Sequence, residues 1–168
     1  MLFFNKNRQM KYLLIITAFT SLTACNSMKQ STKTQVNDFT VLKKMVNEKN
    51  FDFVAERMNP AKGLPRNLTG FYDLKVSNDS LNVQLPYIGQ SNFPPIDPSQ
   101  SPMNFINTSF EYSFTESNDK LNVIIKPTGN TKVQQFLFEI FSNGNATLSV
   151  NSSDKQSISY QGYIAANP

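Results

Sequence analysis

The chain of 168 residues has no histidine, no tryptophan and a single cysteine, and its glycine content is low. Without histidine, the usual Ser–His and Cys–His catalytic pairs cannot form and the usual zinc ligands are missing. One cysteine has no intramolecular partner, so the fold must be stabilised by packing rather than by disulfides. We therefore expect no cofactor and no metal site.

Acidic residues are also few, 12 in all, and the sequence brings no two of them together. Catalysis by paired carboxylates needs two carboxyl groups that face each other across a substrate. The candidates instead fall on outward strand positions, in turns or between prolines: Glu111, Glu139, Asp79, Asp119 and Asp97. The sequence thus favours a protein that is not an enzyme.

The net charge of +4 comes largely from the N-terminus, where Lys6, Arg8 and Lys11 have no acidic neighbour. Without the first 24 residues, 13 basic and 12 acidic side chains remain, a charge of about +1. This balance gives no support for nucleic-acid binding. Residues 25–66 are locally basic, with eight bases and four acids. A solvated linker and helix face explains that excess, and contact with anionic headgroups is the alternative.

The only long apolar run, residues 12–22, is too short to span a bilayer, which needs about 20 residues. It follows the three basic residues, as in a signal peptide. Leu22-Thr23-Ala24-Cys25 then resembles the lipobox of bacterial lipoproteins. The resemblance implies cleavage between Ala24 and Cys25, with diacylglycerol on the thiol and an acyl chain such as palmitate on the new amine. The alternatives are an ordinary signal peptide and an uncleaved anchor.

This reading divides the chain into a lipoprotein signal peptide (1–24), a flexible tether (25–37) and a single β domain with an N-terminal helix (38–168). The lipid on Cys25 would attach the protein to a membrane of the cell envelope. The following residues, NSMKQ, contain no acidic cluster of the kind that resembles a surface-export tag. This favours a position that faces the periplasm, on the outer membrane. Asp38 is placed to cap a helix over 39–50, with Leu42, Met45 and Val46 on one face.

From Phe51 onward, apolar residues alternate with polar ones, which predicts strands that have one buried and one wet face. We expect an all-β antiparallel meander of about eight strands, closed as a small barrel or folded as a sandwich. Asn143-Gly144 indicates a type I′ hairpin turn. Ser-Asn-Asp at 77–79 and again at 117–119 indicates two similar hairpins. The predicted strands are 51–57, 71–76, 81–85, 110–114, 121–125, 136–140, 146–150 and 158–164.

The connection at 85–105 is long and rich in proline, as binding loops often are. Its apolar members Tyr87, Ile88, Phe93 and Ile96 are predicted to lie at the rim of the sheet, where they form a candidate binding loop. Gly89 permits close backbone approach. The alternative is a loop that folds over one end of the core, with Tyr87 hydrogen-bonded into a corner.

Four segments behind the lipobox resemble a known family: FDFVAERMNP, LPYIGQ, NGNATLSVNS and KQSISYQGYI. In this order they are similar to the bacterial lipoproteins known as domain of unknown function 4251. The similarity covers roughly residues 45–165. It implies the architecture and an envelope location, and it brings no activity.

Two non-catalytic functions are left open. The first is a protein-interaction or structural module that docks another envelope protein through an edge strand or the aromatic rim. The second is a binding module for a small apolar ligand or glycan under the 90–103 loop. The abundance of Phe and Tyr at inward positions favours the first, because it predicts a filled interior. Nothing in the sequence sets the oligomeric state.

Asp79-Ser80-Leu81 resembles the Asp-Ser/Thr-aliphatic sites at which some bacteria attach O-glycans to envelope proteins. On this resemblance, Ser80 is a candidate glycan site. A plain hairpin turn is the alternative reading of the same tripeptide.

Overall fold

In the part of the chain that the structure describes, the change from helical to alternating periodicity near Phe51 corresponds to a short helix followed by ten strands. This computed structural model describes residues 33–87, 103–129 and 132–167. Lys33–Pro168 forms one compact unit. No helix in the described ranges is long and apolar enough to cross a membrane.

Helix α2 (Phe39–Asn47) begins where the sequence predicts. The side chain of Asp38 accepts hydrogen bonds from Thr40 N at 2.8 Å and Val41 N at 3.3 Å, as an N-cap does. The predicted apolar face of the helix is buried. The helix ends three residues earlier than predicted, because Lys49 adopts a φ of 51° and turns the chain into the first strand.

The ten strands form one antiparallel sheet in the order β5-β4-β3-β1-β10-β9-β8-β7-β6, with β2 paired to β1 off this path. All eight predicted strands are present, and β2 and β5 were not predicted. The strands are β1 (Phe51–Pro60), β2 (Arg66–Asn67), β3 (Asp73–Val76), β4 (Leu81–Leu85), β5 (Met103–Asn107), β6 (Phe110–Ser117), β7 (Lys120–Pro127), β8 (Val133–Phe141), β9 (Asn145–Ser152) and β10 (Ile158–Ala165).

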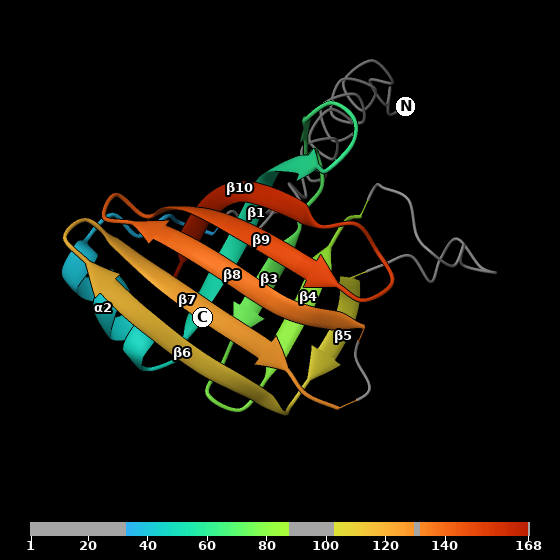
Figure 1. Cartoon of the computed structure of the whole chain (residues 1–168). Helices are drawn as coiled ribbons and strands as arrows, with labels where there is room; N and C mark the ends of the chain where they lie inside the picture. The colour runs from blue at the N-terminus through green and yellow to red at the C-terminus, as the bar shows by residue number, and fades with distance from the viewer. Residues whose placement is uncertain (1–32, 88–102, 130–131, 168) are drawn as a thin grey trace, which may run out of the picture. The chain divides into compact units, whose positions relative to one another are not determined.

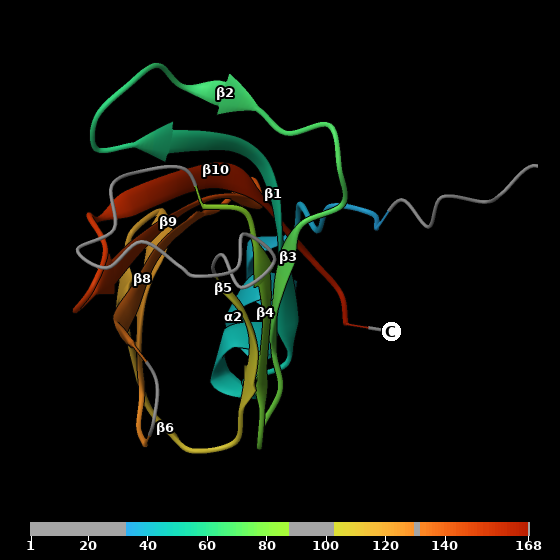
Figure 2. The same ribbon diagram turned by 90° about the vertical axis from the view of Figure 1, so that its right-hand side faces the viewer.

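The sheet curls into a nearly closed barrel rather than two stacked layers (Figure 1). Figure 2 shows β3, β4 and β5 as one wall and β6, β7 and β8 as the opposite wall, with β1, β10 and β9 joining them. A register shift in β1 between Ala55 and Arg57 marks the bend. Before the bend β1 pairs with β3, and after it β1 pairs with β2.

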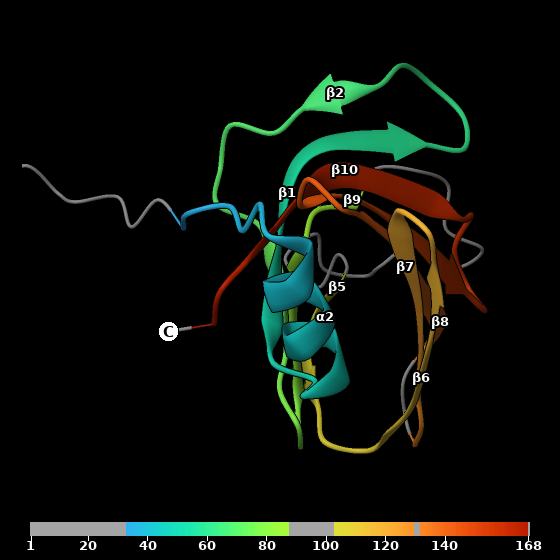
Figure 3. The ribbon, with the colours of Figure 1, turned by 90° about the vertical axis from the view of Figure 1, so that its left-hand side faces the viewer.

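Helix α2 lies between the two walls at one end of the barrel, as Figure 3 shows. Tyr112 on β6 donates its hydroxyl hydrogen to Val46 O at 2.7 Å. Lys43 Nζ lies 2.9 Å from Glu116 Oε1 on the same strand. The helix therefore holds β6 from the inner side.

Aromatic side chains fill the described interior, as the inward Phe and Tyr residues predict. Phe138 makes edge contacts with Phe51 and Phe53, with ring centroids 5.8 Å and 5.7 Å apart. Each fully buried side chain of this size contributes about 1.5–3 kcal/mol relative to its exposed state. Tyr160 is also buried, and its hydroxyl donates to Pro86 O at 2.6 Å.

Residues 33–36 differ from the prediction, because they lie against the sheet rather than in a free tether. Val36 N donates to Ile164 O at 2.9 Å, and Gln35 forms a bridge with Ala165. We call residues 33–36 the strap. Their mostly polar composition gave the appearance of a linker, but backbone hydrogen bonds, the ion pairs of Lys33 and the packing of Val36 against the core hold them on the sheet.

The turns confirm two hairpins and correct a third. Ser77 and Ser80 exchange backbone hydrogen bonds, and Ser117 pairs with Lys120, so both Ser-Asn-Asp segments enter two-residue turns. The turn at Asn143-Gly144 is not type I′, because only Gly144 has a positive φ, 82°. With Ile140 paired to Ala146, residues 142–144 form the longer hairpin loop whose last residue is a left-handed glycine.

Candidate functional site

The residues predicted for the binding loop fall only partly within the structure. Ile88, Gly89, Phe93 and Ile96 lie outside the described residues, as do Ala24 and Cys25 at the predicted cleavage site. Tyr87 is described. Its hydroxyl donates to Gln156 O at 3.2 Å, which is the corner hydrogen bond of the alternative reading.

Tyr87 lines a shallow depression of about 370 Å³ at the rim of the barrel, together with Phe71, Tyr72 and Leu85. Burial raises the pKa of the Tyr87 phenol. Lys155 Nζ lies 5.2 Å from the centroid of the Tyr87 ring, within cation–π distance. Burial also lowers the pKa of Lys155.

Strand β6 is one end of the sheet, and its outer edge pairs with no strand in the described part of the chain. Ser117 and Lys120 flank the two-residue turn to β7 and therefore form a hydrogen-bonded pair. Every second residue of β6, counted back from Ser117, therefore bonds to β7. The residues between them turn their backbone N–H and C=O groups away from β7. These edge residues are Phe110, Tyr112, Phe114 and Glu116.

The backbone groups of these edge residues have no hydrogen-bond partner within the described residues. Natural edge strands are usually protected by a lysine, a proline, a bulge or a short length. β6 is eight residues long and has neither lysine nor proline. The Phe114 side chain is 36% exposed. This edge can therefore accept a further strand.

The opposite end of the sheet is less suited to strand addition. β5 has five residues. The Asn107 side chain donates to Thr128 O at 3.0 Å and accepts from Ser109 N at 3.0 Å, which fixes the corner between β5 and β6. Ile106 is 69% exposed on its outer face.

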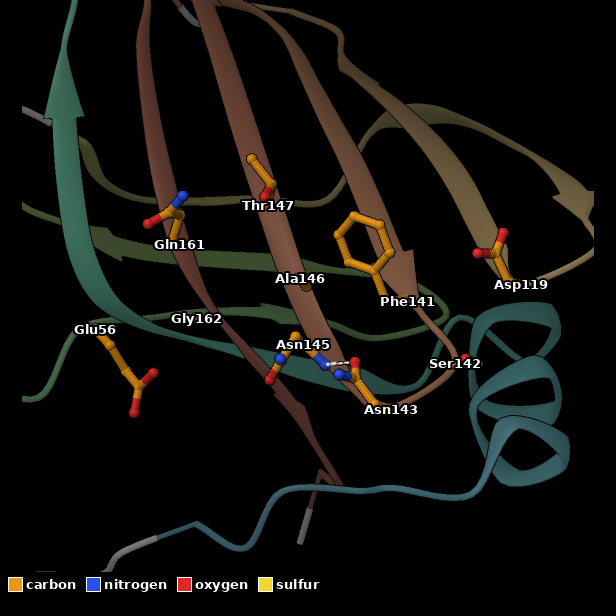
Figure 4. A pocket seen from close by; sticks show the side chains of 10 residues that line it. All are labelled: Glu56, Asp119, Phe141, Ser142, Asn143, Asn145, Ala146, Thr147, Gln161 and Gly162. Atoms are coloured by element: carbon orange, nitrogen blue, oxygen red, sulfur yellow. Dashed lines mark hydrogen bonds between the residues drawn. The ribbon is translucent and has the colours of Figure 1, made fainter.

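A second concave region, which we call the outer trough, lies on the outside of the barrel (Figure 4). It spans β1, β10 and β9 and is bounded by the turns after β6 and β8. Its volume is about 550 Å³. The lining residues used below are Glu56, Asp119, Phe141, Asn145, Thr147 and Gln161.

The strap supports one wall of the outer trough. Gln35 Nε2 donates to Asn143 O at 3.0 Å and to Asn145 Oδ1 at 2.9 Å. Asn145 N donates to Asn143 Oδ1 at 3.0 Å. Position 144 in this turn requires glycine, because a Cβ there would lie 1.9 Å from Val36 O. The turn after β8 and the strap thus fix each other.

A buried ionic cluster beneath the strap was not found from the sequence. Lys33 Nζ forms ion pairs with Asp52 and, at 2.8 Å, with Asp73 Oδ2. Both aspartates were expected on a wet outer face, and both are buried. Burial raises the pKa of the Asp52 carboxyl more than Lys33 lowers it. The available signal was an aspartate between two phenylalanines, at Phe51-Asp52-Phe53.

This cluster is structural in character. Asp52 and Asp73 are neighbours on β1 and β3, and Lys33 occupies the space between their carboxylates. Asp52 Oδ1 is buried and has no hydrogen-bond partner among the residues that the structure describes. No group of three or more His, Cys, Asp or Glu side chains that could hold a metal ion occurs within 33–87, 103–129 and 132–167.

Ser80 lies in the two-residue turn region between β3 and β4 and is half-buried. Its hydroxyl donates to Asp79 Oδ1 at 3.1 Å. This geometry is that of a hairpin turn, and glycan attachment at Ser80 stays a prediction.

The sequence of residues 33–164 matches the family model described as domain of unknown function 4251, DUF4251. The chain belongs to this family. A similar solved structure is the crystal structure of a DUF4251 family protein from Bacteroides eggerthii DSM 20697 at 1.95 Å resolution. The two chains are 13% identical with a TM-score of 0.59, and the match covers 76% of this chain and 87% of the other. No curated protein matches this chain.

The DUF4251 match confirms the family resemblance drawn from the four sequence segments. It begins at Lys33, the first residue of the strap and of the compact unit. At 13% identity, the likeness to the crystal structure concerns the fold alone. The strap therefore belongs to the matched DUF4251 domain rather than to a preceding linker.

Proposed function

We propose that this DUF4251 protein is a lipid-anchored envelope protein that binds an extended segment of another protein along β6 and catalyses no reaction. The observation that carries the proposal is the open eight-residue edge of β6. A partner strand would hydrogen-bond to the backbone of the edge residues, as in β-strand addition. Each such bond contributes about 0.5–1.5 kcal/mol net.

The side chains of β6 indicate the chemistry of the partner. Glu111 and Glu116 are exposed, and the strand carries no basic residue. Glu116 is already paired with Lys43. A lysine or arginine opposite Glu111 would contribute about 0.2–1 kcal/mol, whereas an acid there would oppose binding. The partner segment is therefore extended and basic. Helix α2 supports this mode of binding, because its contacts with Tyr112 and Glu116 keep β6 in place.

Membrane attachment through Cys25 rests on the lipobox-like residues 22–25, and the β1–β2 hairpin supports it. Leu64 in this hairpin is 81% exposed, and it lies in the sequence between Lys62 and Arg66, which are also exposed. An exposed aliphatic residue flanked by bases fits an anionic bilayer surface. We place the protein on the periplasmic face of the outer membrane.

The alternative function, capture of a small apolar ligand or glycan under the 90–103 loop, stays a prediction. That loop lies outside the described residues, apart from Met103. The depression beside Tyr87 would form part of such a site.

Photo-crosslinking in intact cells tests binding at β6. A benzoylphenylalanine at Ser113, which lies on β6 next to the edge, should give an adduct with a partner protein. The same probe at Ser149, on the internal strand β9, is the control and should give none. Phe114→Pro removes an edge N–H that makes no bond to β7 and should abolish the adduct. Phe114→Val keeps this N–H and should retain the adduct.

Equal adducts from Ser113 and Ser149, or an adduct that survives Phe114→Pro, would contradict strand addition at β6. Circular dichroism of Phe114→Pro must show a folded chain for the comparison to count. The anchor is tested separately by fractionating cells that carry Cys25→Ser. We expect this variant to leave the membrane fraction. If it stayed there, uncleaved like the parent, the lipoprotein assignment would be wrong.

A further inference from the structure

The outer trough has the size and position of a ligand site separate from the β6 edge. Its volume of about 550 Å³ lies within the range of small-molecule sites, about 300–1,000 Å³. Asp119 stands on the wall formed by the turn after β6, and Glu56 stands on β1 opposite (Figure 4). Thr147 and Gln161 rise from the sheet between them.

Four polar side chains of the trough are not used by the fold. The Gln161 amide, the Thr147 hydroxyl and the Glu56 and Asp119 carboxylates make no hydrogen bond or salt bridge within the described residues. Together they offer both hydrogen-bond donors and hydrogen-bond acceptors within one concavity. Because the trough is open, water satisfies these groups when no ligand is bound.

An aromatic face completes the lining. Phe141, at the end of β8, is 37% exposed and lies between Thr147 and Asp119 in Figure 4. The face of a phenyl ring carries partial negative charge and attracts weakly positive C–H groups. A ligand with a C–H face and hydroxyl groups around its edge would contact both the ring and the polar groups.

The charge of the lining limits the ligand further. Glu56 and Asp119 are acidic, and none of the described residues that line the trough is basic. Lys120, next to Asp119 in the sequence, is paired with Glu139. An anionic ligand would meet two carboxylates without a compensating cation, which is unfavourable. A long apolar ligand would leave the amide and hydroxyl groups without partners.

We propose that the outer trough binds a neutral oligosaccharide. The Phe141 ring contacts the C–H face of one sugar, and Gln161, Thr147 and the two carboxylates hydrogen-bond to hydroxyl groups of successive sugars along the trough. Each hydrogen bond replaces one with water and contributes little net free energy. The expected dissociation constant is therefore in the millimolar range, about 0.1–5 mM.

Isothermal titration calorimetry on the full chain tests this proposal, in a detergent without a sugar headgroup. The neutral probes are maltotriose, cellotriose, xylotriose, mannotriose and triacetylchitotriose, and trigalacturonic acid is the acidic probe. We expect at least one neutral probe to saturate the protein and the acidic probe to bind at least about 10-fold more weakly. Gln161→Ala and Thr147→Ala should each weaken binding of the neutral probe by about 5-fold or more.

The matched control is Ser149→Ala, on the same face of β9 one outward position along the strand. It should bind the neutral probe as the parent does. The proposal is overturned if no neutral probe binds at concentrations up to about 20 mM. It is also overturned if the acidic probe binds as well as the neutral ones, or if the Thr147 and Ser149 variants bind alike. Circular dichroism confirms that each variant is folded.

Discussion

Replacing Lys33 with methionine tests the strap and the buried ionic cluster together. Lys33 Nζ is the only basic group that pairs with Asp52 and Asp73 in the described residues. Methionine has a similar length, but it loses the cation–π contact of Lys33 Nζ, which lies 5.3 Å from the centroid of the Phe71 ring, together with the ion pairs. The variant therefore removes the ion pairs and leaves two buried carboxylates with only the longer-range attraction of Lys75 on β3.

The expected loss of stability follows from the burial of the partners. Breaking a buried ion pair by removing one member typically costs about 3–5 kcal/mol. The Lys33 side chain is 12% exposed, so water screens part of the interaction, and we expect about 3 kcal/mol. For a domain of this size, such a loss corresponds to a fall in Tm of about 10 °C.

The raised pKa of Asp52 predicts how the stability loss of Lys33→Met changes with pH. A carboxyl whose pKa is raised in the folded state destabilises the fold once it ionises, as the pH rises through that pKa. Asp52 is such a group, because burial outweighs the effect of Lys33. Without Lys33 the penalty grows, so the deficit of Lys33→Met should be largest at neutral pH. It should shrink as the pH falls toward 3.8, the ordinary value for Asp.

Urea unfolding at pH 7 and pH 4 measures these differences, with tyrosine fluorescence as the signal because the chain has no tryptophan. Lys62→Met, at an exposed lysine, is the matched control and should change stability by less than about 0.5 kcal/mol. Adding Asp52→Asn and Asp73→Asn to Lys33→Met should recover part of the loss. If Lys33→Met were as stable as Lys62→Met at both pH values, the ionic cluster would not stabilise the fold as argued.

Four further substitutions test the local geometry by urea unfolding. Gly162→Ala should destabilise by about 2–3 kcal/mol, because its Cβ would lie 1.9 Å from Val54 O. Gly129→Ala, where only a φ of 87° opposes the change, should cost about 1 kcal/mol, and an equal loss at both glycines would contradict the steric argument. Asp38→Ala should cost about 1 kcal/mol through the lost cap of α2. Tyr160→Phe should cost about 1 kcal/mol, because it leaves the carbonyl of Pro86, a half-buried residue, without its donor.

The sequence predicts the strands well because alternation is a local property. Each predicted strand has a buried set at every second position, and eight are present where expected. β5 was missed because its apolar residues follow a proline-rich stretch, which resembles a loop. β2, with two residues, is too short to show any period.

The β6 edge and the outer trough could not be located from the sequence. Which strand is an edge depends on the order of strands in the sheet, and here β1 pairs with β10 across most of the chain. The trough brings together Glu56, Asp119 and Gln161, which are far apart in the sequence. Each of them, taken singly, looks like an ordinary surface residue.

The amino-acid sequence by itself determined the helix cap, the strand alternation, the aromatic content of the core and the family. These follow from side-chain size, polarity and spacing over a few residues. Only the tertiary structure decided that Asp52 and Asp73 are buried and that the strap belongs to the domain. The physical reason is that alternation assigns a side chain to one face of a strand. What covers that face depends on a distant segment, here Lys33, and on the polar contacts it makes there.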